Sequence, residues 1–100
     1  MMDSLRLDAV IYPTWSNVPR LIGDLNTPAG DNSLVFSPTT GMPTITVPMG
    51  YTRNSTLPAG MSILGRAFDE SRLIKLAYSY EQGTKWRKEP PNTPPLRAGR

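Results

Sequence analysis

One stretch of alternating residues limits most strongly what this chain can fold into. Every second residue from Ile45 to Tyr51 is large and apolar, and the residues between them are threonine, proline and glycine. This period indicates a β-strand with one buried face. A polar connection at 53–56 and a second apolar run at 61–64 follow, so the segment predicts an antiparallel β-hairpin. Pro48 has no N–H to donate, which predicts a bulge or a sheet edge at that position.

A helical pattern follows the hairpin directly. Asp69 is a residue type that commonly caps a helix, and Glu70 lies in the first turn, where the helix dipole favours negative charge. Apolar residues then recur at the spacing of one helix face: Leu73, Leu76, Ala77 and Tyr80, with Ile74 and Tyr78 widening the stripe. The pattern predicts one long helix that begins after Asp69 and frays near Gly83. Glu81 and Lys85 have the spacing of an ion pair along a helix.

Two further elements are expected before the hairpin. Residues 9–12 form a short apolar run that Pro13 ends, and such a run fits a strand covered on both faces, as in parallel α/β sheets. Residues 15–43 contain many turn-forming residues, and a short helix is predicted at 32–40 with Asp31 as its N-cap, although a proline inside it weakens that prediction. The expected fold class is therefore α/β, with a parallel strand, an antiparallel hairpin and one long helix packed together.

Composition excludes several kinds of site. The chain has no cysteine and no histidine, so disulfides, thiol nucleophiles, thiolate metal sites and a self-contained Ser-His-Asp triad are all excluded. We expect no metal and no cofactor. The net charge of +3 comes from scattered basic residues, which is too little clustering for a nucleic-acid surface. Lys85, Arg87 and Lys88 do gather around Trp86, but cations are ordinary near a helix carboxyl end.

Length and hydropathy set the outer bounds. One hundred residues allow at most one domain, expected at 1–89, and the proline-rich residues 90–100 are expected to form an extended tail. No apolar run approaches the roughly 20 residues that cross a bilayer, and the amino end lacks the features of a signal peptide. The expectation is a cytoplasmic protein with no membrane partner.

Several short motifs stand in order between about residue 8 and residue 91. A strand that ends in Tyr-Pro-Thr is followed by Gly-Met-Pro-Thr-Ile-Thr-Val-Pro-Met-Gly-Tyr, Leu-Pro-Ala-Gly-Met, Leu-Gly-Arg, Phe-Asp-Glu and Ala-Tyr-Ser-Tyr-Glu-Gln. This order and spacing resembles the carboxy-terminal quarter of the amidase-signature hydrolases. The resemblance implies a partial amidase-signature fold, which in the intact family is a large mixed sheet with helices on both faces.

The same resemblance implies hydrolysis of a carboxamide through an acyl-serine intermediate in the intact enzyme. Enzymes of this family use a serine nucleophile, a second serine in a cis peptide and a lysine base, in place of histidine. Their lysine and their glycine-rich nucleophile loop lie far upstream, and no serine of this chain is flanked by glycines that could present an oxyanion hole. The prediction is a carboxy-terminal fragment with no catalytic residue, inactive alone.

Three residues are predicted, through the resemblance, to contact substrate. Counting back from Gly41, Asp31 falls where the family's amidotransferase members hold an aspartate that contacts the substrate amino group; the alternative is that Asp31 only caps the short helix. The loop at residues 13–17 follows the first strand at its carboxyl end, where open α/β sheets place ligands, and it is predicted to line the acyl pocket, with Thr14 and Trp15 as contact residues. For Trp15 a core or interface position is an equal alternative. Lys75 lies off the apolar stripe and is expected to be a solvated charge.

Three interpretations of the chain stay open at this point. It is a fragment of an amidase, or the complementing half of a split amidase whose serines and lysine lie on another chain, or a non-catalytic assembly and binding module. The apolar face that begins at Ile45, together with the strand edges, predicts self-association or binding to a complementary amidase chain. The amide substrate is expected only in the intact enzyme.

Overall fold

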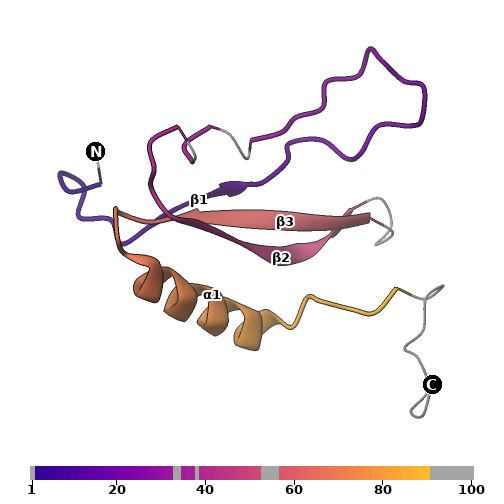
Figure 1. Cartoon of the computed structure of the whole chain (residues 1–100). Helices are drawn as coiled ribbons and strands as arrows, with labels where there is room; N and C mark the ends of the chain where they lie inside the picture. Colours follow the sequence, from indigo (N-terminus) through magenta and orange to yellow (C-terminus); the bar gives the residue numbers. More distant parts are fainter. Residues whose placement is uncertain (1, 33–34, 38, 53–56, 91–100) are drawn as a thin grey trace, which may run out of the picture.

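The computed structural model describes residues 2–32, 35–37, 39–52 and 57–90. Within these residues, three strands and one helix follow in chain order: β1 (Val10–Pro13), β2 (Thr44–Thr52), β3 (Leu57–Leu64) and α1 (Glu70–Thr84). Figure 1 shows α1 beneath the sheet and the long segment between β1 and β2 rising above it. No helix in this described part of the chain is long and apolar enough to cross a membrane.

Strand β3 is the centre of the sheet, and both neighbours run antiparallel to it. Its Ile63 pairs with Ile11 of β1 on one side and with Ile45 of β2 on the other. The prediction of a parallel strand at 9–12 is therefore wrong. The return strand of the hairpin inserts between β1 and β2, so β1 meets an antiparallel partner, and an apolar run does not encode the direction of its neighbour. Nor is β1 covered on both faces, because Ile11 is 63% exposed.

The predicted hairpin is confirmed. β2 and β3 pair antiparallel from Thr44 and Leu64 to Thr52 and Leu57, on either side of the connection at 53–56, which lies outside the described residues. The register shifts between Pro48 and Gly50, and β2 is an edge strand, so both features predicted from Pro48 are present. Because of this shift the alternation does not run unbroken to Tyr51.

The core lies between α1 and the sheet. Four buried side chains form its centre, and five half-buried ones pack around them: Val47, Ile63, Leu73 and Ala77, then Ala9, Ile45, Met61, Leu76 and Tyr80. The predicted helix and its principal stripe are thus confirmed. The wider stripe is wrong, because Ile74 and Tyr78 are 60% and 64% exposed and lie on a side of α1 that the sheet does not cover.

The two ends of α1 differ in detail from the prediction. Asp69 precedes the helix, but its side chain makes no capping hydrogen bond, and its carboxylate lies 3.3 Å from Arg72 Nε instead. At the other end Lys85 adopts a left-handed conformation, with its N–H donating to the Glu81 carbonyl. Because of this turn the Lys85 side chain does not lie one helical turn above Glu81, and the predicted ion pair between the two does not form. Lys85 Nζ donates to Gln82 Oε1 at 2.7 Å.

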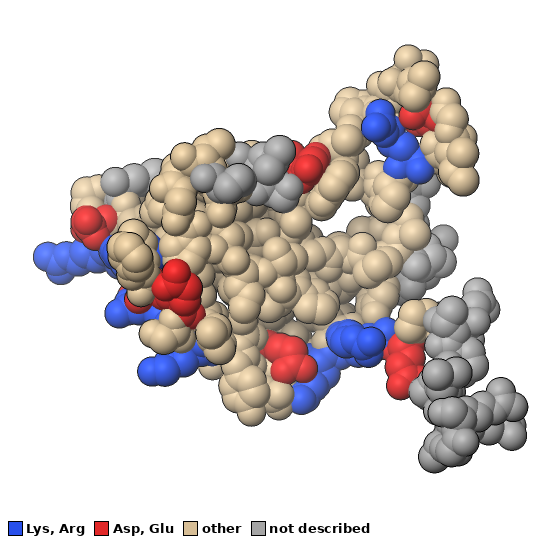
Figure 2. Space-filling model, in the orientation of Figure 1, with Lys and Arg blue, Asp and Glu red and all other residues tan. Residues whose placement is uncertain are grey.

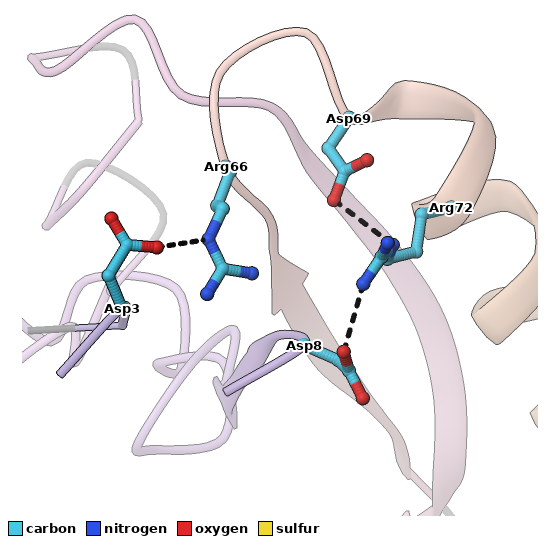
Figure 3. A network of polar contacts seen from close by, with 5 residues as sticks. All are labelled: Asp3, Asp8, Arg66, Asp69 and Arg72. Carbon is cyan, nitrogen blue, oxygen red and sulfur yellow. Dashed lines mark hydrogen bonds and ion pairs between the residues drawn. The ribbon is translucent and has the colours of Figure 1, made fainter. Parts of the chain in front are cut away.

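Ion pairs connect the amino-terminal segment to the region around the start of α1 (Figure 3). Arg66 Nε lies 2.8 Å from Asp3 Oδ1, and Arg72 Nη1 lies 2.9 Å from Asp8 Oδ1. All four side chains are well exposed or half-exposed, and such pairs typically contribute less than about 1 kcal/mol each. Their role is to hold the segment before β1 in place rather than to stabilise the core.

The short helix predicted at 32–40 is absent from the described part of that range. Residues 35–37 and 39–40 form bends and turns, while 33–34 and 38 lie outside the described residues. The chain before them is extended: Asp31 forms an isolated antiparallel bridge with Trp15, and the Asn32 N–H donates to the Thr14 carbonyl at 2.9 Å. Pairing with residues 14–16 has replaced the helical start.

A matched pair of glycine substitutions tests the packing of α1 on the sheet. A Cβ added at Gly65 would approach Leu73 Cδ2 to 2.9 Å, whereas nothing lies within 4 Å of one added at Gly83 in α1. Gly65→Ala is expected to lower the free energy of unfolding by about 1–3 kcal/mol, because Leu73 must move within the core. Gly83→Ala is expected to raise it by about 1 kcal/mol, since alanine favours the helix. Urea unfolding measures both, and changes of the same sign would contradict the packing described.

Candidate functional site

A row of hydroxyl groups crosses the sheet on the face opposite the core. Ser62 of β3 is 1% exposed, and its Oγ lies 2.7 Å from Thr14 Oγ1 and 3.3 Å from Thr46 Oγ1. A serine becomes a nucleophile when an adjacent base takes its proton. Within the described residues the hydrogen-bond partners of Ser62 are hydroxyls, and none is a base. The row therefore links β3 to β2 and to the residue that follows β1, and it does not activate Ser62.

Residues 14–32, here called the arm, leave the sheet after β1 and return beside their own start (Figure 1). The Ser16 N–H donates to the Gly30 carbonyl at 2.7 Å. The Asn32 side chain donates from Nδ2 to Ser16 Oγ at 2.7 Å and to the Pro13 carbonyl at 3.0 Å. These bonds and the bridge between Trp15 and Asp31 fasten the two limbs of the arm together near the sheet.

Gly30 sits at a close approach between the two limbs. Its φ of +73° is left-handed, and a Cβ there would lie 2.8 Å from the backbone nitrogen of Asn17. The Asn17 side chain also crosses the gap, donating from Nδ2 to the Pro28 carbonyl at 3.0 Å. Only glycine fits this position without moving one limb.

The tip of the arm is both apolar and polar. Leu21, Ile22 and Leu25 are among the most exposed apolar side chains of the molecule, at 82%, 107% and 86%. Beside them the Asp24 carboxylate accepts hydrogen bonds from the Asn26 and Thr27 N–H groups at 3.0 and 3.1 Å. A hydrogen bond from the Thr27 side chain, and then these backbone bonds, hold the pKa of Asp24 below its ordinary value.

A pocket of about 770 Å³ lies between the arm and the far end of the hairpin. In Figure 2 the arm stands away from the body of the molecule with open space below it. The apolar part of the lining comes from both sides: Pro13, Trp15, Val18, Pro19, Ala29, Met49, Pro58 and Ala59. Ser16, Asn17 and Thr52 add polar groups. Of the described lining residues, Arg20 is the single charged one, and its Nη1 donates to the Thr27 carbonyl at 3.3 Å.

The three predicted contact residues reach different places. Trp15 lines the pocket and is 48% exposed. Asp31 is brought next to Trp15 by the bridge, but it is not part of the pocket lining, and Thr14 directs its hydroxyl to Ser62. Contact of these three with a substrate stays a prediction. The wall contributed by Met49 and β3 was invisible to sequence reasoning, because no local pattern shows that the hairpin end faces the arm.

The basic segment after α1 packs against the hairpin. The Lys88 N–H donates to the Tyr51 hydroxyl at 3.1 Å, and Lys88 Nζ lies 5.3 Å from the centre of the Tyr51 ring. The Trp86 ring lies beside Gly50. Lys88 and Trp86 thus have structural partners within the chain. The described residues contain no group of three or more side chains able to hold a metal ion.

Substituting two glycines of the arm tests its closure. Gly30→Ala and Gly23→Ala both place a Cβ at positive φ, but nothing lies within 4 Å of the Gly23 position. We expect both to cost about 1–2 kcal/mol through the left-handed backbone, and Gly30→Ala to separate the limbs as well. Amide hydrogen exchange at Ser16 and Asn32 should therefore accelerate at least about tenfold in Gly30→Ala and little in Gly23→Ala. Equal exchange in both variants would contradict the close approach.

Comparison with known proteins gives a consistent set of relatives, although no family model matches the chain. It is 33% identical over 91 residues to the A subunit of the glutamyl-tRNA(Gln) amidotransferase of Thermodesulfovibrio yellowstonii, in a match that covers 86% of this chain and 19% of that protein. The corresponding protein of Clostridium botulinum strain Eklund 17B is 40% identical over 90 residues (85% and 18%). The A subunit numbered 1 of Clostridium acetobutylicum is 42% identical over 84 residues (79% and 17%). The chain spans about a fifth of the length of these curated relatives.

Proposed function

Because this chain belongs to the amidase-signature family, as these relatives do, we propose that it forms the carboxy-terminal part of an amidase catalytic unit and does not hydrolyse amides alone. The observation that carries this proposal is the coverage: the match takes in 86% of the chain and only 19% of the relative. In the complete unit the reaction is hydrolysis of a carboxamide through an acyl-serine intermediate. The three-stranded sheet would join the larger mixed sheet of that unit.

The chemistry of the described residues supports the absence of turnover. Ser62 is buried and bonded to two threonine hydroxyls, so no group stands ready to take its proton. Lys75 is exposed on α1 and belongs to no ion pair or hydrogen bond with a serine in this part of the chain. The nucleophile and base of the complete unit are therefore assigned to residues other than these.

We assign this chain the role of a wall of the substrate site. The arm is fastened at its base by the Asn32 and Ser16 contacts, which gives Trp15 a fixed position at the pocket. The bridge holds Asp31 next to Trp15 in the chain's other limb, at the base of the arm. A rigid wall of this kind orients an acyl group without taking part in bond breaking.

The relatives are named as subunits of a glutamyl-tRNA(Gln) amidotransferase. For this chain we propose a complementary amidase chain as partner, because a substrate-site wall without a nucleophile acts only together with the part that supplies the nucleophile. A split enzyme, with its serines and lysine on another chain, is one form of this proposal.

Complementation tests the proposal directly. The purified chain, incubated with glutamine and simple carboxamides, is expected to release ammonia at background rate only. Mixed with the remaining upstream part of the Clostridium acetobutylicum relative, it is expected to restore ammonia release. Lys75→Ala should restore it equally well, because this lysine is solvent-exposed. Leu73→Asp, which places a charge in the core, should fail. Turnover by the lone chain, or none in the mixture, counts against the proposal.

A second candidate function is a non-catalytic assembly module. It is favoured by apolar side chains that protrude into solvent: Leu21, Ile22, Leu25 and Phe68, all more than four-fifths exposed. Exposed apolar surface of this extent is expected to bind another protein or a second copy of the chain.

Light scattering separates this candidate from the first. An assembly module is expected to show a mass that rises with concentration, and Ile22→Ser should reduce that rise because it removes an apolar side chain from the arm tip. Ile74→Ser, on the exposed side of α1, is the control for a general loss of apolar surface. A monomer at all concentrations would leave the amidase wall as the better account.

A further inference from the structure

The size, lining and charge of the pocket between the arm and the hairpin limit which ligands it can accept. Its walls are mainly apolar and include a tryptophan and three prolines, Pro13, Pro19 and Pro58. A pocket of about 770 Å³ falls in the size range of small-molecule sites, which are commonly apolar with a few placed polar groups.

Two neighbouring polar residues present complementary groups. Ser16 Oγ accepts a hydrogen bond from Asn32, so its own O–H remains available as a donor. Asn17 donates from Nδ2 to the Pro28 carbonyl, so its Oδ1 remains available as an acceptor. One donor and one acceptor on consecutive lining residues match the C=O and NH₂ of a primary carboxamide.

The charge on the pocket lining limits the charge that the acyl group of the ligand can carry. Arg20 is the single charged side chain among the described lining residues, and it is held in place through the Thr27 carbonyl. A cationic group in the pocket would meet this guanidinium with no carboxylate in the lining to compensate it. An uncharged apolar group meets the walls of Trp15 and Met49 instead.

We propose that this pocket binds a small primary carboxamide with an uncharged apolar acyl group, and that it discriminates against cationic acyl groups through Arg20. The amide lies against Ser16 and Asn17, and the acyl group lies against Trp15, Met49 and Ala59. The inference rests on the proposed function for the carboxamide class, and it adds which carboxamides the wall accepts.

Calorimetric titration of the full chain tests the inference with two probes. Phenylacetamide is the uncharged probe, and its 4-aminomethyl derivative is the cationic one. Phenylacetamide is expected to bind saturably, and the cation at least about threefold more weakly. Arg20→Gln should remove that difference by strengthening the binding of the cationic probe. Cationic and uncharged probes binding equally well to the unaltered chain, or no saturable binding of either, would overturn the inference.

A space-filling variant locates the binding. Ala59→Leu adds bulk to the pocket wall without removing any hydrogen bond, and is expected to weaken phenylacetamide at least about tenfold, or 1.4 kcal/mol. Phe68→Ala changes an exposed side chain outside the pocket and should have no effect. Trp15→Ala is expected to weaken the binding of both probes, and it serves as the second pocket variant if Ala59→Leu does not fold. Unchanged affinity in the folded pocket variants would overturn the inference.

Binding is read as heat, so it does not depend on turnover. Loss of probe binding while complementation restores ammonia release contradicts the inference alone. Probe binding without complementation contradicts the proposed function alone.

Discussion

The double pairing of β3 positions the other two strands and, through them, the base of the arm. Its residues from Met61 to Leu64 bond to β1 on one side and β2 on the other, so the two segments that flank the arm are brought into one sheet. The same strand turns Ile63 toward α1 and Ser62 toward the opposite face. A core, a polar row and the base of the arm are thus fixed by one strand of alternating side chains.

That strand also explains how few groups are left for chemistry. A hydroxyl that links neighbouring segments must keep its partners, and Ser62 is held in this way by Thr46 of β2 and by Thr14, which follows β1. In the arm, the side-chain N–H groups of Asn32 and Asn17 likewise donate to the arm's own two limbs and to Pro13. Within the pocket, the Ser16 O–H, the Asn17 Oδ1 and an apolar wall remain available, and they suit orientation of a ligand better than its cleavage.

The sequence predicted those features that depend on neighbours along the chain. The hairpin, the irregularity at Pro48 and the helix after Asp69 arise from local periodicity and residue type, and all are present. The direction of β1 and the extended path at Asp31 depend on contacts between distant segments, and both predictions failed. The pocket could not be found from the sequence for the same reason. Trp15 was predicted as a pocket residue from its position after a strand. The opposite wall of the pocket comes from the distant hairpin, which that position does not reveal.

The prolines of the two outer strands have a consequence for how another strand can join this sheet. Pro48 interrupts the free side of β2 at the register shift, and Pro13 ends β1, so neither edge offers a long uninterrupted row of N–H groups. The stretch from Val10 to Tyr12 is the unbroken part of the β1 edge. Thr44–Val47 is the corresponding part of the β2 edge. Lateral growth is thereby confined to these two short stretches, which are poor templates for copies of this chain to stack into fibrils.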